Sequence, residues 1–151
     1  MQRKKESKPI YAYLLVFLQF TSLLFVMLSA PILANHWAFL MLQILGVFLG
    51  VWAIWVMRIG NFNITPTPVE NGKLRKSGPY ATIRHPMYTS IILFTFPELV
   101  NSYSFWRLMV LLVLFITIIF KIKFEEKNLL QQFPNYKDYK RETKKIIPYL
   151  Y

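Results

Sequence analysis

A short motif, Arg84-His85-Pro86, contains the side chains best suited to bind a charged ligand. Gly78 and Pro79 precede it and predict a tight turn that lets backbone come close to a ligand. Pro86 suits the first position of a helix, where its missing N–H costs no hydrogen bond. The N-terminus of that helix would attract an anion such as a carboxylate. Taken singly, Arg84 is better explained as an anchor beside an apolar segment and His85 as a helix cap, but their combination favours a ligand site.

A second motif contains adjacent carboxylates, Glu125 and Glu126, in a chain with only seven acidic residues and a net charge of +11. At the C-terminal end of a helix they would repel each other and oppose the helix dipole. One interpretation is local pairing with Lys121, Lys123 or Lys127. The other is a site for a cation, such as a sulfonium or α-ammonium group. The sequence does not decide between them.

The C-terminal region adds Tyr136 and Tyr139, which are three residues apart and would share one face of a helix. They would pack on the membrane interface or close over a bound ligand, and the first is the simpler interpretation of each residue alone. The chain has no cysteine, and His36 and His85 are far apart in sequence. We therefore expect no metal site.

Four apolar segments are expected to position these motifs in an all-α membrane bundle that forms one domain, residues 1–151. Crossing a bilayer takes about 20 helical residues, and the chain is 55% hydrophobic. We expect spans at about residues 10–33, 37–57, 87–101 and 104–123. A signal peptide is the alternative for the first segment, but its apolar run exceeds the ~7–15 residues of such peptides. The third segment is short and either stops near Pro97 or continues past it as the first arm of a hairpin.

Small residues on the second segment carry a further structural expectation. Gly46 and Gly50 are four residues apart, a spacing that lets another helix approach closely. Glycine is also simply common in membrane helices, and the sequence favours neither explanation.

The distribution of basic residues predicts the orientation. Of the 18 Lys and Arg residues, 17 fall in the N-terminal tail, in residues 58–86 or from Lys121 onward, and only Arg107 falls on the opposite side. Because basic residues collect on the cytoplasmic side, we expect four crossings with both termini cytoplasmic, together with loop 58–86 and tail 124–151. The positive charge then reflects topology and attraction to anionic lipid rather than binding of nucleic acid.

The motifs in this order resemble the superfamily of isoprenylcysteine carboxyl methyltransferases and phospholipid methyltransferases. They are Gly-Pro-Tyr (78–80), Arg-His-Pro-x-Tyr (84–88), a hydrophobic hairpin, Glu-Glu-x-x-Leu (125–129), Phe-x-x-Tyr-x-x-Tyr (133–139) and a proline at 148. The resemblance runs from about residue 61 to residue 148. One position departs from the pattern, since Ser90 stands where the family usually has glycine.

The resemblance implies a cytoplasmic site for S-adenosylmethionine. Leu74, Gly78, Pro79 and Tyr80 would line its adenosine side, and Arg84, His85 and Tyr88 would hold its carboxylate end. Glu125 and Glu126 would bind its ammonium group, its ribose hydroxyls or the surroundings of its sulfonium, and Tyr136 and Tyr139 of the tail would complete the site. The residues implied to be catalytic are Arg84, His85, Glu125 and Glu126.

The methyl acceptor stays open among a prenylcysteine-like carboxylate, a phospholipid amine and another small amphiphile, entering between the second span and the hairpin. An amine or hydroxyl acceptor would need a base, for which His85 or a glutamate is available. The main alternative is a non-catalytic membrane protein, such as a small transporter or assembly factor. Transporters usually carry ionisable residues inside their spans, and we expect none here, which favours the enzyme.

Overall fold

The computed structural model describes residues 9–29, 31–57, 65–67 and 72–148. Within these residues the chain is helical, and its only strand-like pairing is an isolated bridge between Ile83 and Lys144. The expected all-α class is therefore confirmed. The elements are α1 (Ile10–Leu28), α2 (Trp37–Met57), the short 3-10 helix η1 (Gly78–Ala81), α3 (Pro86–Asn101), α4 (Phe105–Gln132) and α5 (Tyr136–Glu142).

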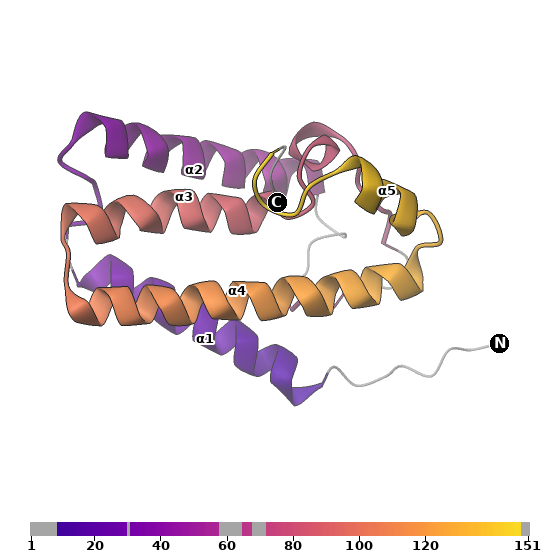
Figure 1. The fold of residues 1–151 in the computed structure, drawn as a ribbon, viewed down its shortest axis with the longest axis horizontal. Coiled ribbons are helices and arrows are strands. Elements are labelled where there is room, and N and C mark those ends of the chain that lie inside the picture. Colours follow the sequence, from indigo (N-terminus) through magenta and orange to yellow (C-terminus); the bar gives the residue numbers. More distant parts are fainter. Residues whose placement is uncertain (1–8, 30, 58–64, 68–71, 149–151) are drawn as a thin grey trace.

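The long helices lie side by side, with α2 packed mainly on α3 and α1 mainly on α4 (Figure 1). Helices α1, α2 and α4 are long and apolar enough to cross a membrane. Helix α3 has 16 residues, about 24 Å of helix, which is less than the ~30 Å hydrocarbon core. It continues past Pro97 and forms a hairpin with α4, as one of the two interpretations predicted. A fourth crossing by α3 stays a prediction.

Two helix boundaries differ from those expected. Helix α1 ends at Leu28 rather than near residue 33, because Ser29 caps it and Pro31 lacks the N–H that would continue it. Helix α4 runs to Gln132 instead of ending near residue 123. The residues after Lys123 are good helix formers, and the helix stops only at Phe133, the residue before a proline. Glu125 and Glu126 therefore lie within a helix rather than at its end.

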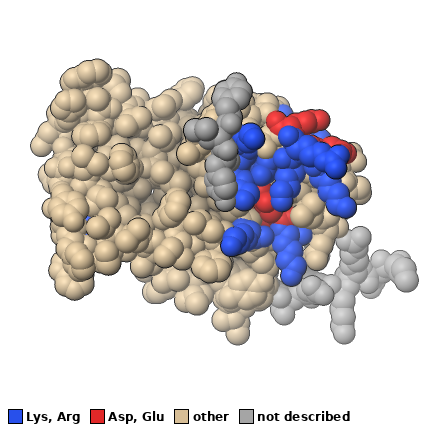
Figure 2. Space-filling view, viewed as in Figure 1, with Lys and Arg blue, Asp and Glu red and all other residues tan. Residues whose placement is uncertain are grey.

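The charged residues gather at one end of the bundle, which we call the charged end. Figure 2 shows Lys and Arg crowded around the end that carries α5, and almost none over the rest of that face. The segments expected to share this side include the N-terminal tail and loop 58–86. Residues 1–8, 58–64 and 68–71 of these segments lie outside the described residues.

The glycines of α2 are required by close packing on α3. A Cβ atom at Gly46 would lie 3.0 Å from the Ser90 carbonyl oxygen and 3.1 Å from the Phe94 nitrogen. A Cβ atom at Gly50 would lie 3.0 Å from the Ser90 hydroxyl oxygen. Ser90, the departure from the family pattern, is thus still small enough for this contact. The contact leaves no room for a lipid between α2 and α3 at the level of Gly46.

We expect Gly46→Val to lower the free energy of unfolding in detergent by about 1–3 kcal/mol, because the clash is with backbone atoms that cannot move aside. Val47→Leu, at an exposed position on the same helix, should change it by less than about 0.5 kcal/mol. Chemical unfolding followed by circular dichroism would measure both. Equal stability of the two variants would contradict the packing argument.

The opposite end of the bundle holds a buried ion pair. Arg107 Nη2 donates to Glu98 Oε2 at 3.1 Å, and Gln43 Nε2 donates to Glu98 Oε1 at 2.6 Å. Arg107 also donates to the carbonyl oxygen of Val26 at 3.2 Å. One network therefore joins α1, α2, α3 and α4. The expectation that the spans contain no ionisable residue is wrong, because Glu98 lies within α3 and Arg107 within the first turn of α4.

Candidate functional site

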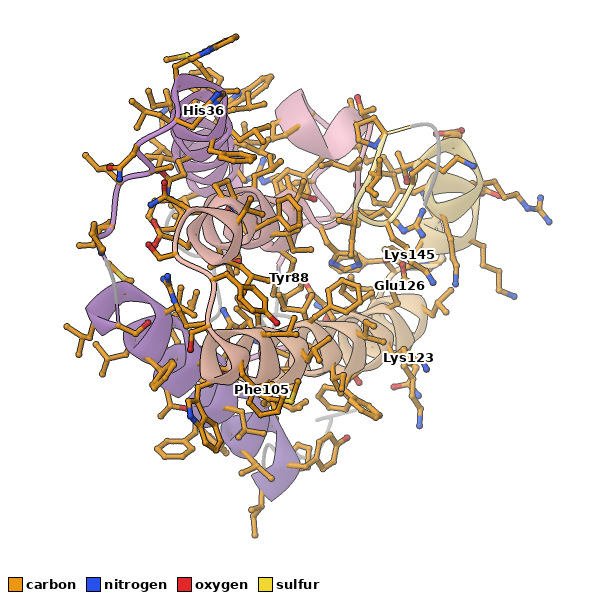
Figure 3. The ribbon with its side chains drawn as sticks, turned by 60° about the vertical axis from the view of Figure 1, so that its left-hand side comes forward. His36, Tyr88, Phe105, Lys123, Glu126 and Lys145 are labelled. Carbon is orange, nitrogen blue, oxygen red and sulfur yellow. The ribbon has the colours of Figure 1, made fainter. Side chains whose placement is uncertain are left out.

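A cavity of about 310 Å³ opens at the charged end, where side chains from α1, α2, α3, α4, η1 and α5 meet. It brings together residues that are distant in sequence, as expected from the motifs. In Figure 3 the labelled Lys123, Glu126 and Lys145 lie at the end of the bundle that carries α5. The sequence-predicted site residues that line the cavity are Leu74, Tyr80, Arg84, His85, Tyr88, Glu125, Tyr136 and Tyr139.

Gly78 and Pro79 lie elsewhere. They border a second, largely apolar cavity of about 860 Å³ formed with α2, α4 and the C-terminal tail. Gly78 has a φ of +60°, and a Cβ there would lie only 2.8 Å from a methyl group of Val56. What approaches this glycine closely is therefore helix α2.

Arg84 ties the C-terminal tail to the bundle. Its Nε donates to Glu126 Oε1 at 2.8 Å, and its Nη1 donates to the carbonyl oxygens of Lys140, at 3.1 Å, and Thr143. Its backbone N–H donates to the carbonyl oxygen of Lys144 at 2.8 Å. Arg84 is 7% exposed. Most N–H groups of the Arg84 guanidinium therefore already donate hydrogen bonds to the protein itself.

Glu126 takes part in the same set of contacts between the bundle and the tail. Besides Arg84, it pairs with Lys140 of α5, whose Nζ lies 3.2 Å from Glu126 Oε2. The sequence offered pairing with Lys121, Lys123 or Lys127, but these ion pairs are made with residues distant in sequence. Glu126 is absent from the residues that line the cavity. Its carboxylate connects α4 to α5 and to the segment before α3.

Glu125 is the carboxylate that faces the cavity. Its Oε2 accepts a hydrogen bond from the Tyr88 hydroxyl at 3.2 Å and lies 3.6 Å from His85 Nδ1. The rings of His85 and Tyr88 stack with centroids 5.7 Å apart. The Glu125 side chain keeps 27% exposure, whereas that of Glu126 keeps 8%. Of the two adjacent carboxylates, Glu125 is therefore the one placed to meet a cation.

Three tyrosines form an aromatic wall. The Tyr139 hydroxyl donates to the carbonyl oxygen of Tyr80 at 2.7 Å. Tyr136 is fully buried, and its hydroxyl has no hydrogen-bond partner among the described residues. Burial raises the pKa of the Tyr80, Tyr136 and Tyr139 phenols well above the usual value, so all three stay protonated. The Tyr136 hydroxyl remains able to bond a ligand.

Sequence reasoning missed several polar residues that line the cavity, namely Gln19, Thr65, Thr67, Lys73, Arg75 and Lys121. Lys121 had a usable signal, because it lies four residues before Glu125 and so shares its helix face. Gln19 interrupts an apolar segment, but nothing in the sequence pairs it with this site. Arg75 has a buried Nε without a hydrogen-bond partner in the described part of the chain. Within that part, no group of three His, Cys, Asp or Glu side chains is placed to hold a metal ion.

Comparison with known proteins gives this cavity its context. The search of curated proteins returns no match to this chain. The family model described as phospholipid methyltransferase matches residues 34–136, about two thirds of the chain. These residues include all of α2, η1, α3 and α4, and the first residue of α5. By this match the chain belongs to the phospholipid methyltransferase family, and together with its long apolar helices the match identifies it as a membrane methyltransferase.

Proposed function

We propose that the protein transfers a methyl group from S-adenosylmethionine to a lipophilic acceptor at the cytoplasmic face of the membrane. The observation that carries this proposal is the cavity at the charged end, where the half-open carboxylate of Glu125 faces a wall of buried tyrosines. A cavity of this kind suits a ligand that combines a cationic centre with an aromatic ring system. S-adenosylmethionine is such a ligand.

The residues present fit this cofactor. The cavity, with a volume of about 310 Å³, lies at the lower end of the size range of ligand pockets. Glu125 would hold the positively charged end of the cofactor, and Tyr80, Tyr136 and Tyr139 would enclose the adenosine. Arg75, whose Nε has no hydrogen-bond partner among the described residues, is better placed to bind the methionine carboxylate than Arg84, whose guanidinium already binds Glu126 and the tail.

The chemistry supplied by the bound cofactor is an electrophilic methyl group, which bonds to a lone pair of the acceptor while the carbon–sulfur electrons return to sulfur. The protein then contributes orientation and electrostatics. A carboxylate acceptor loses no proton in the transfer. An amine acceptor must lose one, and His85 is the candidate to accept it, with Nδ1 3.6 Å from Glu125 Oε2 and Nε2 3.6 Å from Glu126 Oε1.

The proposed orientation has four crossings, with α3 as the short third one and both termini cytoplasmic. The charge asymmetry in Figure 2 supports it, because the basic side chains gather at the end that carries the cavity. A reporter fused to either terminus, or a cysteine placed in residues 31–36 and labelled from the outside, would test it. Labelling of residues 31–36 from the cytoplasmic side alone would contradict this orientation.

Calorimetric titration of the detergent-purified protein with S-adenosylhomocysteine tests the proposed function. We expect saturable binding at one site. Transfer of labelled methyl groups from S-adenosylmethionine into a membrane lipid or lipidated protein fraction should follow. Absence of binding by folded protein would overturn the proposal.

Two tyrosine variants form a matched test of the cavity. We expect Tyr136→Phe to weaken binding of S-adenosylhomocysteine about five- to tenfold while leaving stability unchanged, because its hydroxyl has no described protein partner to lose. Tyr139→Phe loses the bond to Tyr80 and should lower the free energy of unfolding by about 1 kcal/mol. Calorimetry and chemical unfolding of both variants measure the contrast. The reverse pattern would show that the Tyr136 hydroxyl does not meet the ligand.

A further inference from the structure

Lys121 is a buried cation at the cavity wall. Lys121 is only 2% exposed, and it lines the cavity. Its Nζ donates to Gln19 Oε1 of α1 at 2.5 Å and lies 5.5 Å from the centre of the Tyr88 ring. Among the described residues, that amide oxygen is the one hydrogen-bond acceptor for three ammonium donors. The remaining donors are available to a ligand.

Among the described residues, no carboxylate forms a direct ion pair with Lys121. A buried charge is costly unless an opposite charge and hydrogen bonds compensate it. The nearest carboxylate along α4 is Glu125, which is already engaged by Tyr88 and faces His85. Gln19 is neutral, and the aromatic face of Tyr88 attracts the ammonium more weakly than a carboxylate would. An anion in the cavity would supply the missing partner.

We propose that Lys121 binds an oxyanion of the methyl acceptor and that Gln19 positions its ammonium group to do so. The inference rests on the proposed methyl transfer and names the chemistry of the acceptor, an amphiphile that carries an oxyanion near the atom to be methylated. Two sources share this chemistry, the phosphodiester of a phospholipid and the carboxylate of a lipidated amino acid. Lys121 and Glu125 lie about 6 Å apart along the axis of α4, so the acceptor anion and the cofactor cation would sit one helical turn apart.

Through Gln19, helix α1 contributes to the proposed oxyanion site. The family match begins at residue 34, so α1 lies outside the matched residues. Gln19 is nevertheless 7% exposed, lines the cavity and reaches a residue 102 positions away in the chain. The helix that precedes the family region thus supplies a positioning residue to the site.

The test measures binding of an oxyanion without requiring turnover. Full-length protein in maltoside micelles, saturated with S-adenosylhomocysteine, is titrated with dodecyl phosphate. We expect Lys121→Gln to weaken saturable binding at least tenfold. The matched control is Lys123→Gln, which removes the same charge from the same helix at an exposed position that does not line the cavity of Lys121, and it should change the affinity less than twofold. Equal effects of the two variants would overturn the inference.

Substitutions of Gln19 separate a binding role from a structural one. Gln19→Glu places a carboxylate against the Lys121 ammonium, so it should keep or raise stability but weaken dodecyl phosphate binding at least tenfold. Gln19→Ala should weaken it less, because the ammonium loses its orientation but stays unpaired. Thr21→Ala, at an exposed position of α1, is the control. Unchanged dodecyl phosphate binding by a stable Gln19→Glu protein would show that the pair is only structural.

Methyl transfer then identifies the source of the oxyanion. The acceptors are phosphatidylethanolamine in phosphatidylcholine vesicles, N-acetyl-S-farnesylcysteine, and dodecylamine, which has no oxyanion. We expect label in one of the first two at no less than ten times the efficiency of dodecylamine, and loss of this preference in Lys121→Gln. Label in dodecylamine at equal efficiency, or in neither oxyanion acceptor, would overturn the inference. Failure to bind S-adenosylhomocysteine would instead remove the proposed function.

Discussion

Replacing Arg84 with methionine should release the C-terminal tail and lower the free energy of unfolding by about 3–5 kcal/mol, the usual cost of breaking a buried ion pair from one side. The guanidinium holds Glu126 of α4 and the carbonyl oxygens of Lys140 and Thr143. Methionine keeps the length of the side chain but none of its donors. Glu126 would remain buried with Lys140 and, 3.6 Å from its Oε1, His85 Nε2 as its remaining partners.

Chemical unfolding in detergent would measure the loss of stability, and limited proteolysis at Lys144 and Lys145 would report the released tail. Arg141→Met is the matched control, since Arg141 is an exposed basic residue on α5, and it should change stability by less than about 0.5 kcal/mol. Equal protease resistance of Arg84→Met and Arg141→Met would contradict a tethering role for Arg84.

We expect Glu125→Gln to weaken ligand binding without lowering stability, the opposite of Arg84→Met. The two variants therefore separate ligand binding from tethering of the tail. Within the described residues, Glu125 makes no hydrogen bond or ion pair to the tail, and the glutamine amide oxygen can still accept the hydrogen bond of Tyr88. Stability should therefore stay close to that of the original protein. Loss of the negative charge should weaken S-adenosylhomocysteine binding at least about tenfold. A stable Glu125→Gln protein with unchanged affinity would remove Glu125 from the cofactor site.

Replacing Arg107 with methionine should cost a similar ~3–5 kcal/mol at the far end of the bundle. Arg107 donates to Glu98, to the carbonyl oxygen of Ser102 at 2.8 Å and to that of Val26. The substitution leaves the carboxylate of Glu98, which is 1% exposed, with only the Gln43 amide as a hydrogen-bond donor among these partners. An unpaired buried carboxylate is the main cause of the expected loss.

A double-mutant cycle tests that cause. Glu98→Leu combined with Arg107→Met removes both charges and should recover part of the stability lost in Arg107→Met, because apolar pairs often replace buried ion pairs without loss. Unfolding of the two single variants and of the double variant measures the coupling. Losses that simply add would show that Glu98 and Arg107 stabilise the bundle independently. Cofactor binding should survive in the folded fraction, since neither residue lines the cavity.

The helices could be predicted from the sequence because each depends on its own residues. Long apolar runs form α1, α2 and α4, and Pro86 marks the start of α3, where its missing N–H is tolerated. The motifs also predicted that Arg84, His85, Tyr88 and Glu125 belong to one site. The apolar pattern does not define every helix boundary, because polar helix formers extend α4 beyond its apolar part to Gln132.

The sequence by itself determined the apolar segments, the asymmetry of charge and the residue types of the candidate site. Only the tertiary structure decided which partners the charged side chains take: Arg84 pairs with Glu126, Arg107 pairs with Glu98, and Lys121 donates to the neutral amide of Gln19. The physical reason is that helix formation follows local propensity and apolar pattern, whereas a side chain finds its partner only once helices pack. The two adjacent carboxylates show this best, since packing neutralises Glu126 with the tail and leaves Glu125 facing the cavity.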